Sequence, residues 1–559
     1  MGLIKVASTK RLRAAAAAAA VLAATAGLTV GLTGRATAAA GRAAAAAACT
    51  AGTLVQTRDG PVCGVTANGV TSYLGVPYAA PPVSNLRWEP PAPVTPWTTT
   101  LQATAPGNIC AEPSLSGGVT GSEDCLNLNV QVPAGTRAEQ RLPVMVEIHG
   151  GGFLLFGPPD GSHLVGAGHI VYVAMNYRLG ILGFMANKAL GPHSGDYGLQ
   201  DQQAALRWVQ ANIARFGGDP HDVTIFGQSA GGASVCEQVA SPTAKGLFEK
   251  ADSESGFYNS AVGPNQVWEA ADCKSQLPTE AQAQHAGAAF AAKVGCGTAA
   301  NQLACLRTLP AATLVQNAGQ VLNPAAGGTI APTINGTTLP MSPGKAFATG
   351  HVNDVSLMIG VSRDEINGGV NTPTTTASTP AQYRALVREK YGRLAPAVFA
   401  LYPLARYPAP SPFIAFRTIV ADADSVCPAL VVDQRLARHI PVYAWEDDDA
   451  DTPTTFLSPS DPNGAYHDAA AVFLLPSPGA VFDANQAALD AQLTTQVTGY
   501  AATGNPTVGG TPLWTRYTRG NPEVMSLVPA GDSALVPAGV LATQHNCGFW
   551  DAVTRTPSH

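Results

Sequence analysis

Residues 227–231 (GQSAG) have the G-x-S-x-G spacing of a serine nucleophile. They follow an apolar run at 223–226 (VTIF) and precede residues 232–235 (GASV), which can begin a helix. A serine on a tight strand-to-helix turn stands above the edge of a sheet, and small flanking residues avoid clashes in that turn. Ser229 is therefore the candidate nucleophile for acyl transfer.

A second motif supplies backbone N–H groups that can stabilise a developing negative charge. Residues 149–153 (HGGGF) follow the apolar run at 144–148 (VMVEI). Because glycines carry no side chain, their N–H groups can approach a reacting carbonyl oxygen closely. The N–H groups of Gly151, Gly152 and Ala230, the residue after the candidate nucleophile, would form an oxyanion hole with three donors.

A serine hydroxyl also needs a histidine base, and after a G-x-S-x-G turn the order along the chain is serine, acid, histidine. Six histidines follow Ser229: His285, His351, His439, His467, His545 and His559. His467 lies in a glycine-containing loop ahead of an apolar segment, which is where a mobile base would lie. His545 is its rival.

The candidate acid follows another predicted strand. Residues 355–359 (VSLMI) predict this strand, and Asp364 and Glu365 come shortly after it. A carboxylate there lies on the same side of the sheet as the serine turn. Spacing alone does not separate the two acids, and either could instead form a cap or a salt bridge.

The elements that would position these residues alternate between strands and helices. Residues 144–148, 170–175 and 223–226 are short, continuous apolar runs of the kind found in parallel sheets. A set of apolar residues recurs at helical spacing before Gly217, namely Leu199, Leu206, Val209, Ile213 and Phe216. This order predicts the α/β class, with a mostly parallel central sheet covered by helices on both faces. The regions near 262–350 and 370–425 are predicted to be loop and helical insertions on that sheet.

The first forty residues have the pattern of a secretory signal peptide. Four basic residues between positions 5 and 13 precede an alanine-rich stretch, and small residues at 36, 38 and 40 offer cleavage points. A membrane anchor is the alternative, although alanine is only weakly hydrophobic. We predict that residues 1–40 are removed and that residues 41–559 form one secreted, extracellular domain.

Composition excludes several classes of protein. The 559 residues are 46% hydrophobic and 13% charged, which is too apolar for a disordered chain. A net charge of −6 without a basic run beyond the N-terminus predicts no nucleic-acid partner. No later segment is long and apolar enough for stable membrane insertion. The acidic residues 446–451 (EDDDAD) lack the spaced ligands of a calcium loop and predict a solvated loop.

The ten cysteines are an even number and would pair in an oxidising compartment. Cys110 with Cys125 and Cys296 with Cys305 are close enough in sequence to form local loops. No CxxC pair or Cys/His cluster has zinc-site spacing. We therefore expect structural disulfides, no metal and no cofactor.

With these motifs the chain resembles the type-B carboxylesterase/lipase family of cholinesterase-like α/β-hydrolases. The shared motifs run from about residue 50 to residue 552. They are SEDCLNLN at 122–129, HGGGF at 149–153, NYRLG at 176–180, GLQDQ at 198–202, RWVQANIARFGGDP at 207–220, the serine turn, Asp364-Glu365, the His467 loop, and GNP at 504–506 followed by Trp514. The resemblance implies the α/β-hydrolase fold and a secreted, bacterial-type carboxylesterase.

The resemblance also implies roles for individual residues. It implies a catalytic triad of Ser229 as nucleophile, Glu365 as acid and His467 as base. It also implies that Gly151, Gly152 and Ala230 are the oxyanion donors, and that Ser255 matches a serine that lies near the triad in the family. The family's two recurrent disulfides match Cys110 with Cys125 and Cys296 with Cys305. A third pairing, Cys427 with Cys547, is a weaker match, and Cys49, Cys63, Cys236 and Cys273 remain unassigned.

Three departures from the family pattern affect what can be inferred. Gln228 stands where the family commonly has a glutamate. Its side chain is expected to point away from the nucleophile, so variation at this position should be tolerated. Ile366 replaces a common glycine after the acid. The loop between Cys110 and Cys125 is short and contains no tryptophan, which argues against choline-ester hydrolysis because that reaction uses an aromatic ring to bind the ammonium group.

We therefore expect a serine hydrolase that cleaves carboxylic esters of small molecules through an acyl-enzyme. Short-chain or aryl esters are the expected substrates. The alternative is a lipase acting on long-chain acylglycerols, and a further alternative is a non-catalytic, cholinesterase-like binding protein. A lipase would need a mobile apolar lid, and the loop between Cys110 and Cys125 is short and polar.

Overall fold

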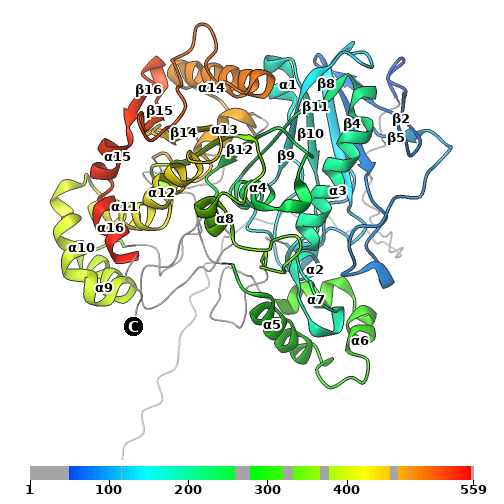
Figure 1. Ribbon diagram of the computed structural model, residues 1–559, viewed down its shortest axis with the longest axis horizontal. Coiled ribbons are helices and arrows are strands. Elements are labelled where there is room, and N and C mark those ends of the chain that lie inside the picture. The colour runs from blue at the N-terminus through cyan, green and yellow to red at the C-terminus, as the bar shows by residue number, and fades with distance from the viewer. Residues whose placement is uncertain are drawn as a thin grey trace, which may run out of the picture. The chain divides into compact units, whose positions relative to one another are not determined.

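Eleven strands form the central sheet within the described part of the chain (Figure 1). The computed structural model describes residues 49–114, 116–257, 273, 277–318, 331–365, 377–453, 464–477 and 479–554. The predicted signal peptide therefore lies outside the described residues. From one edge to the other the strands are β16 (Ala534–Pro537), β15 (Glu523–Leu527), β14 (Val442–Asp447), β13 (Ser356–Ser362), β12 (Lys250–Glu254), β11 (Gly218–Gln228), β9 (Leu142–Ile148), β10 (Val171–Met175), β8 (Asn127–Pro133), β4 (Val70–Pro77) and β3 (Val65–Ala67).

The middle of this sheet is parallel and its two edges are antiparallel. Every neighbouring pair from β10 to β15 runs parallel, whereas β3, β4, β8 and β16 pair antiparallel with their neighbours. This confirms the predicted mostly parallel sheet. Because β9, β11, β12 and β13 are neighbours, the segments that follow them emerge at one edge. Smaller sheets form from β1 (Val55–Gln56), β2 (Pro61–Cys63) and β5 (Leu101–Gln102), and from β6 (Glu112–Pro113) and β7 (Val119–Thr120).

Both faces of the sheet are apolar, because its central strands are continuous hydrophobic runs. In β9, Val144, Val146 and Ile148 contact one buried cluster, and Met145 contacts the other. The first cluster includes residues of α3 (Tyr197–Asn212), α4 (Ala230–Ala240), α8 (Pro343–Thr349) and α12 (Cys427–Leu436). The second includes residues of α1 (Ser162–Gly168), α13 (Ala469–Leu474) and α14 (Ala484–Thr503). The prediction of helices on both faces is thus confirmed.

The predicted insertions contain several helices among their described residues. The first contains α5 (Glu280–Lys293), α6 (Gln302–Thr308) and α7 (Ala311–Ala318) as well as α8. The second contains α9 (Pro380–Tyr391), α10 (Ala395–Leu401) and α11 (Ser411–Ala421). Helices α9, α10 and α11 share a third buried cluster with the C-terminal α16 (Cys547–Thr554). Figure 1 shows α9 and α10 near the red α16. The remaining α-helices in the described ranges are α2 (Gly180–Phe184) and α15 (Ala538–Gln544).

Two local predictions need correction. The strand predicted at 355–359 extends to Ser362 as β13, because Val361 and Ser362 pair with the end of β14. The acidic segment 446–451 is not a solvated loop, since Glu446 and Asp447 end β14 and are buried. Asp449 is buried as well, and Asp448 forms an ion pair with Arg363 at 3.0 Å. The acidic segment is buried because its first residues pair with neighbouring strands, and residue spacing does not reveal such pairing.

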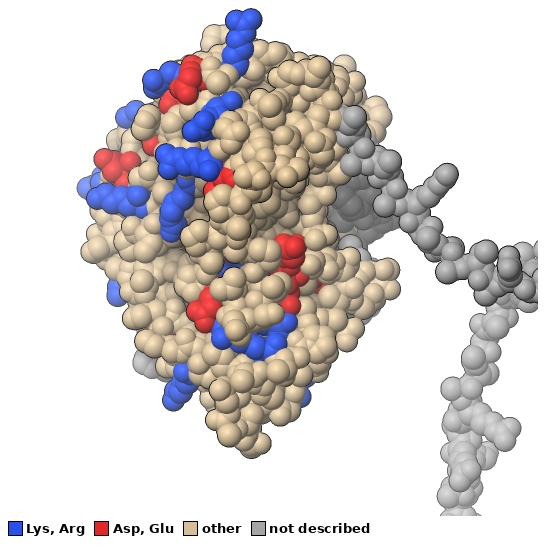
Figure 2. Space-filling model, turned by 90° about the vertical axis from the view of Figure 1, so that its right-hand side faces the viewer, with Lys and Arg blue, Asp and Glu red and all other residues tan. Residues whose placement is uncertain are grey.

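Charge is sparse on the face shown in Figure 2. Lys and Arg side chains gather toward one side of that face, with Asp and Glu among them, and broad areas between are uncharged. On this face the Lys and Arg side chains do not form a continuous basic patch. None of the helices in the described ranges has the length and hydropathy to cross a bilayer.

Candidate active site

Ser229 is the single residue between β11 and α4. Its backbone has φ 62° and ψ −126°, which is unusual for a residue with a side chain. The Ser229 N–H donates to Glu254 O of β12 at 2.9 Å, and its own carbonyl accepts from Ala233 N at 2.9 Å, which begins the helix. A β-carbon at Gly231 would lie 1.9 Å from Ile148 O, so only glycine fits where the turn crosses β9. The local sequence thus forms the strained turn that exposes a nucleophile.

The glycine-rich loop after β9 lies against this turn. A β-carbon at Gly150 would lie 2.7 Å from Gln228 O and 3.1 Å from the β-carbon of Ser229. His149 is buried and stacked on Tyr177, whose hydroxyl donates to His149 O at 2.8 Å. Burial lowers the pKa of His149 to about 4, so this imidazole is neutral and serves to hold the loop.

The three predicted oxyanion donors lie in these two segments. Ala230 is the first residue of α4, so its N–H has no acceptor within the helix. Gly151 and Gly152 have φ of 100° and 64° in a tight turn, where Gly151 O accepts from the N–H groups of Leu154 and Leu155 at 3.0 and 3.1 Å. N–H groups that are not used by a helix or sheet can bind a developing oxyanion.

Glu365 and His467 are in direct contact. Nδ1 of His467 lies 2.5 Å from Oε2 of Glu365, and the other carboxylate oxygen accepts from the N–H of Ser362 at 3.0 Å. The Glu365 side chain is almost fully buried. Since an ionised carboxylate only accepts hydrogen bonds, the contact keeps a proton on Nδ1 and the lone pair of neutral imidazole on Nε2.

Two further residues hold the His467 loop, and sequence reasoning missed both contacts. Asp364 accepts from Ala465 N at 3.1 Å and donates its own N–H to Ala465 O at 2.9 Å. The Gln228 amide donates to His467 O at 2.9 Å. The loop is thereby tied to the segments that carry Glu365 and Ser229. Both contacts join residues more than 100 positions apart, so no local signal could have indicated them.

The surroundings of His467 favour its charged form. Burial lowers the pKa of His467. The charge and hydrogen bond of Glu365, together with nearby Asp468, raise this pKa by more than burial lowers it, so the net shift is upward. The pKa of Asp468 is itself raised, mainly by burial. A base with a raised pKa holds a proton more strongly than a free imidazole does.

Ser255 and His545, the remaining candidates, lie in different surroundings. Ser255 follows β12, has φ 49° and donates its N–H to Gly360 O of β13 at 2.8 Å, at the edge of the sheet from which Ser229 projects. His545 is buried between two carboxylates, with Nδ1 2.6 Å from Asp422 and Nε2 3.3 Å from Glu446. Both of its nitrogens are thus engaged by acids, so the rival base is an element of a buried ion network.

The cysteines form five disulfides. Cys110–Cys125 and Cys296–Cys305 are the two pairs that the resemblance implied, and Cys427–Cys547 is the weaker match. The two other pairs, Cys49–Cys63 and Cys236–Cys273, involve the previously unassigned cysteines. Five disulfides indicate an oxidising compartment. Within the described ranges no group of three His, Cys, Asp or Glu side chains could hold a metal ion.

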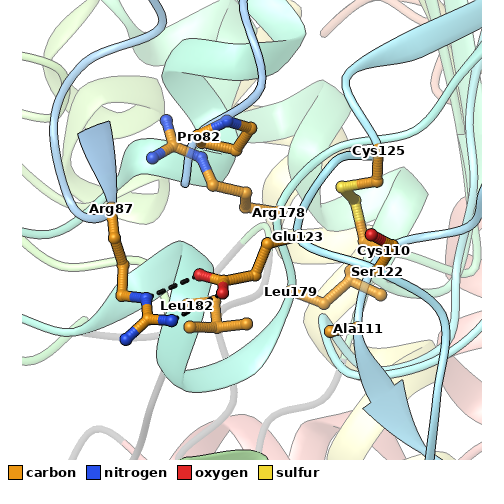
Figure 3. A pocket seen from close by; sticks show the side chains of 10 residues that line it. All are labelled: Pro82, Arg87, Cys110, Ala111, Ser122, Glu123, Cys125, Arg178, Leu179 and Leu182. Carbon is orange, nitrogen blue, oxygen red and sulfur yellow. Dashed lines mark hydrogen bonds and ion pairs between the residues drawn. A yellow bond between two sulfur atoms is a disulfide. The ribbon is translucent and has the colours of Figure 1, made fainter. Parts of the chain in front are cut away.

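A small hollow lies beside the Cys110–Cys125 disulfide, and none of Ser229, Glu365 and His467 lines it (Figure 3). It is lined by the ion pair of Arg87 and Glu123, at 2.6 Å, and by Arg178 and apolar side chains. Arg178 is buried and pairs with Asp201 at 2.7 Å. All three charged side chains that line the hollow are already paired, so it is part of the scaffold around the disulfide loop.

The arrangement is suited to attack on a carbonyl group. It combines a serine on a strained turn, backbone N–H groups beside it, and a histidine that contacts a buried carboxylate.

Comparison with known proteins agrees with this chemistry. The model of the family described as "Carboxylesterase family" matches residues 51–550. Para-nitrobenzyl esterase of Bacillus subtilis (strain 168) is 42% identical over 328 residues, which cover 56% of this chain and 63% of that protein. Esterase E4 of Myzus persicae is 45% identical over 217 residues, covering 36% of this chain and 39% of that protein. The alignments thus span less than two thirds of these relatives.

A solved structure is similar over more of its length. The structure titled "PNB ESTERASE" superposes with a TM-score of 0.71 at 31% identity, covering 88% of this chain and 99% of that one. This similarity confirms the predicted α/β-hydrolase fold.

Replacement of His545 tests the buried network. His545→Gln leaves Asp422 and Glu446 without their shared cation, and we expect it to lower the free energy of unfolding by about 3 kcal/mol. The two carboxylates hold the pKa of His545 well above its usual value, despite burial. Its stabilising contribution is therefore fully present below about pH 6.5, the unfolded pKa, and is lost as the pH rises through the folded pKa.

Chemical denaturation at pH 6 and pH 9 measures this effect. The difference between wild type and variant should be larger at pH 6. The exposed His351→Gln serves as a control that we expect to change little. An equal loss at both pH values would contradict a charged His545.

Proposed function

The chain belongs to the carboxylesterase family, and we propose that it hydrolyses carboxylic esters with Ser229 as the nucleophile, Glu365 as the acid and His467 as the base. The observation that carries this proposal is the contact of 2.5 Å between Glu365 and His467. It joins two residues that are distant in sequence. The segment that bears His467 is hydrogen-bonded to the residue next to Ser229.

The proposed reaction has two steps. Ser229 Oγ attacks the ester carbonyl while Nε2 of His467 accepts its proton, and His467 then protonates the leaving alcohol to give an acyl-enzyme. Water, deprotonated by His467, releases the acid in the second step. Gly151, Gly152 and Ala230 would donate to the oxyanion in both steps, and each such donor is typically worth about 3 to 4 kcal/mol. Ser255 would support the triad from the end of β12.

The proposed substrates are small esters with short acyl chains or aryl groups. One relative is named a para-nitrobenzyl esterase, which agrees with a compact aromatic ester. The described residues 116–125 of the short disulfide loop are mostly polar or small, which does not favour an apolar lid for long acyl chains. Hydrolysis of long-chain acylglycerols is therefore the alternative, and a series of substrates would decide between the two.

We also propose that the protein is exported and that residues 1–40 are removed. The charged, apolar and small-residue order of the N-terminus and the five disulfides support this. N-terminal sequencing of protein from the culture medium should give a start near residue 41. An intact residue 1 in that protein would contradict cleavage.

Hydrolysis of p-nitrophenyl esters from acetyl to palmitoyl tests the reaction. We expect the highest kcat/KM with short acyl chains, and a loss of at least about 10⁴-fold in Ser229→Ala because the nucleophile is removed. Ser255→Ala is the matched control and should reduce the rate far less. A maximum at long chains would indicate the lipase alternative. Undiminished turnover by Ser229→Ala would refute the assignment, and absence of turnover with every ester would favour the binding-only alternative.

The pH profile tests the roles of Glu365 and His467. Only neutral His467 can accept a proton, so kcat/KM should rise with pH, with a midpoint above the ordinary 6.5 because the pKa of His467 is raised. Glu365→Gln removes the largest upward influence and leaves burial to lower the pKa. We expect its midpoint to shift to lower pH, and kcat to fall by about 10³-fold or more.

The exposed Asp124→Asn removes one negative charge elsewhere and should leave both the midpoint and the rate unchanged. A midpoint that stays the same in Glu365→Gln would show that another group sets the profile.

A further inference from the structure

Phe156 is an exposed aromatic residue at the end of the glycine-rich loop. Its side chain is 53% exposed, whereas Phe153 and Leu154, on the same turn, are buried. Isolated exposed hydrophobic residues are common and need no explanation on their own. Phe156 differs from the others because of its backbone and its position.

The backbone of Phe156 is strained. Its φ is 79°, a left-handed conformation that bulky residues seldom adopt. Among the described residues, the other Phe, Tyr or Trp residues with positive φ are Trp88 and Phe153. Both are almost fully buried, so packing offsets their strain. The exposed ring of Phe156 has much less packing to offset it.

The position of Phe156 is fixed by its neighbours. The N–H groups of Leu154 and Leu155 both donate to Gly151 O, which folds the chain back on itself. A β-carbon at Gly151 would lie 2.2 Å from Leu155 O and 2.8 Å from Cδ2 of Phe156, so the ring lies directly against Gly151. Phe153 anchors the turn through an edge contact with Phe184, at 5.3 Å between ring centroids, and accepts from Gly180 N at 2.7 Å.

These observations place a solvent-facing aromatic ring beside a proposed oxyanion donor. Strained backbone conformations cluster at active sites and in segments that hold ligands. A glycine would adopt this backbone without strain, so the fold itself gives no reason for a phenylalanine here. The exposed part of the ring can therefore contact a molecule that binds beside Gly151.

We propose that Phe156 determines specificity by stacking against an aromatic ring in the ester, either in the alcohol or in the acyl group. The proposal rests on the function proposed above. Aromatic pairs gain from edge or offset stacking beyond their buried area, and an aromatic side chain has few rotatable bonds, so it loses little conformational freedom on binding. The substrate class that this geometry favours is therefore benzyl or phenylacetyl esters over saturated esters of the same size.

Paired substrates isolate this effect from intrinsic reactivity. Benzyl acetate is compared with cyclohexylmethyl acetate, and methyl phenylacetate with methyl cyclohexylacetate, since the members of each pair differ mainly in aromaticity. We expect Phe156→Gly to reduce the aromatic preference in kcat/KM by about three- to tenfold for at least one pair. Phe156→Tyr should retain the preference, and Leu54→Ala, at another exposed hydrophobic residue, should not change it.

Thermal unfolding separates a functional role from a structural one. Because glycine relieves the positive φ, Phe156→Gly should unfold at a temperature no lower than wild type. An aromatic preference equal to wild type for both pairs would overturn the inference. A lower unfolding temperature with an equal loss on all four esters would also overturn it, since Phe156 would then be structural.

The failure of the underlying function gives a different result. Ethyl acetate, which has no ring, should be hydrolysed equally by wild type and by the control Leu54→Ala, and not by Ser229→Ala. If wild type hydrolyses no ester, or Ser229→Ala retains activity, the proposed function fails and this inference fails with it.

Discussion

The strained turn at Ser229 is the constraint on which the rest of the site depends. A parallel strand passes into a helix through one residue, with no loop to absorb the change of direction. The turn is held because β9 and β12 flank β11 on both sides, and because its backbone bonds to Glu254 and Ala233. Such a conformation persists only where its surroundings over-determine it. The buried parallel sheet therefore supplies the rigidity that exposes the serine.

The histidine is held in a different way. His467 lies ahead of α13 and outside the sheet, so no strand fixes it. Instead Glu365 contacts its ring, Asp364 pairs with the backbone of Ala465, and Gln228 bonds to its carbonyl oxygen. These contacts attach a loop residue to two strand ends. The position of His467 is here imposed by hydrogen bonds and not by a strand, and Gln228 supplies one of these bonds.

The sequence predicted those structural features that depend on residues close together in the chain. The apolar runs at 144–148 and 170–175 became β9 and β10, and the serine motif lies on the strand-to-helix turn that it implied. Spacing could not choose between Asp364 and Glu365 or between His467 and His545, and the resemblance made that choice. The burial of Glu446 and Asp447, the ion network of His545 and the contact of Gln228 depend on pairings between distant segments. No local pattern contains that information.

Other buried acids lie at the end of β14, whereas Glu365 and Asp468 are the acids that raise the pKa of His467. If every acid around β14 were ionised, their like charges would repel one another within a buried region. Burial opposes this, since it raises the pKa of Asp448 to about 6 and that of Asp364 and Asp447 above their usual range. Arg363 and His545 neutralise part of the remaining charge, at 3.0 Å from Asp448 and 2.6 Å from Asp422. Glu365 thus acts on a base that must be neutral to react, while burial and pairing limit the charge that the acids around β14 carry.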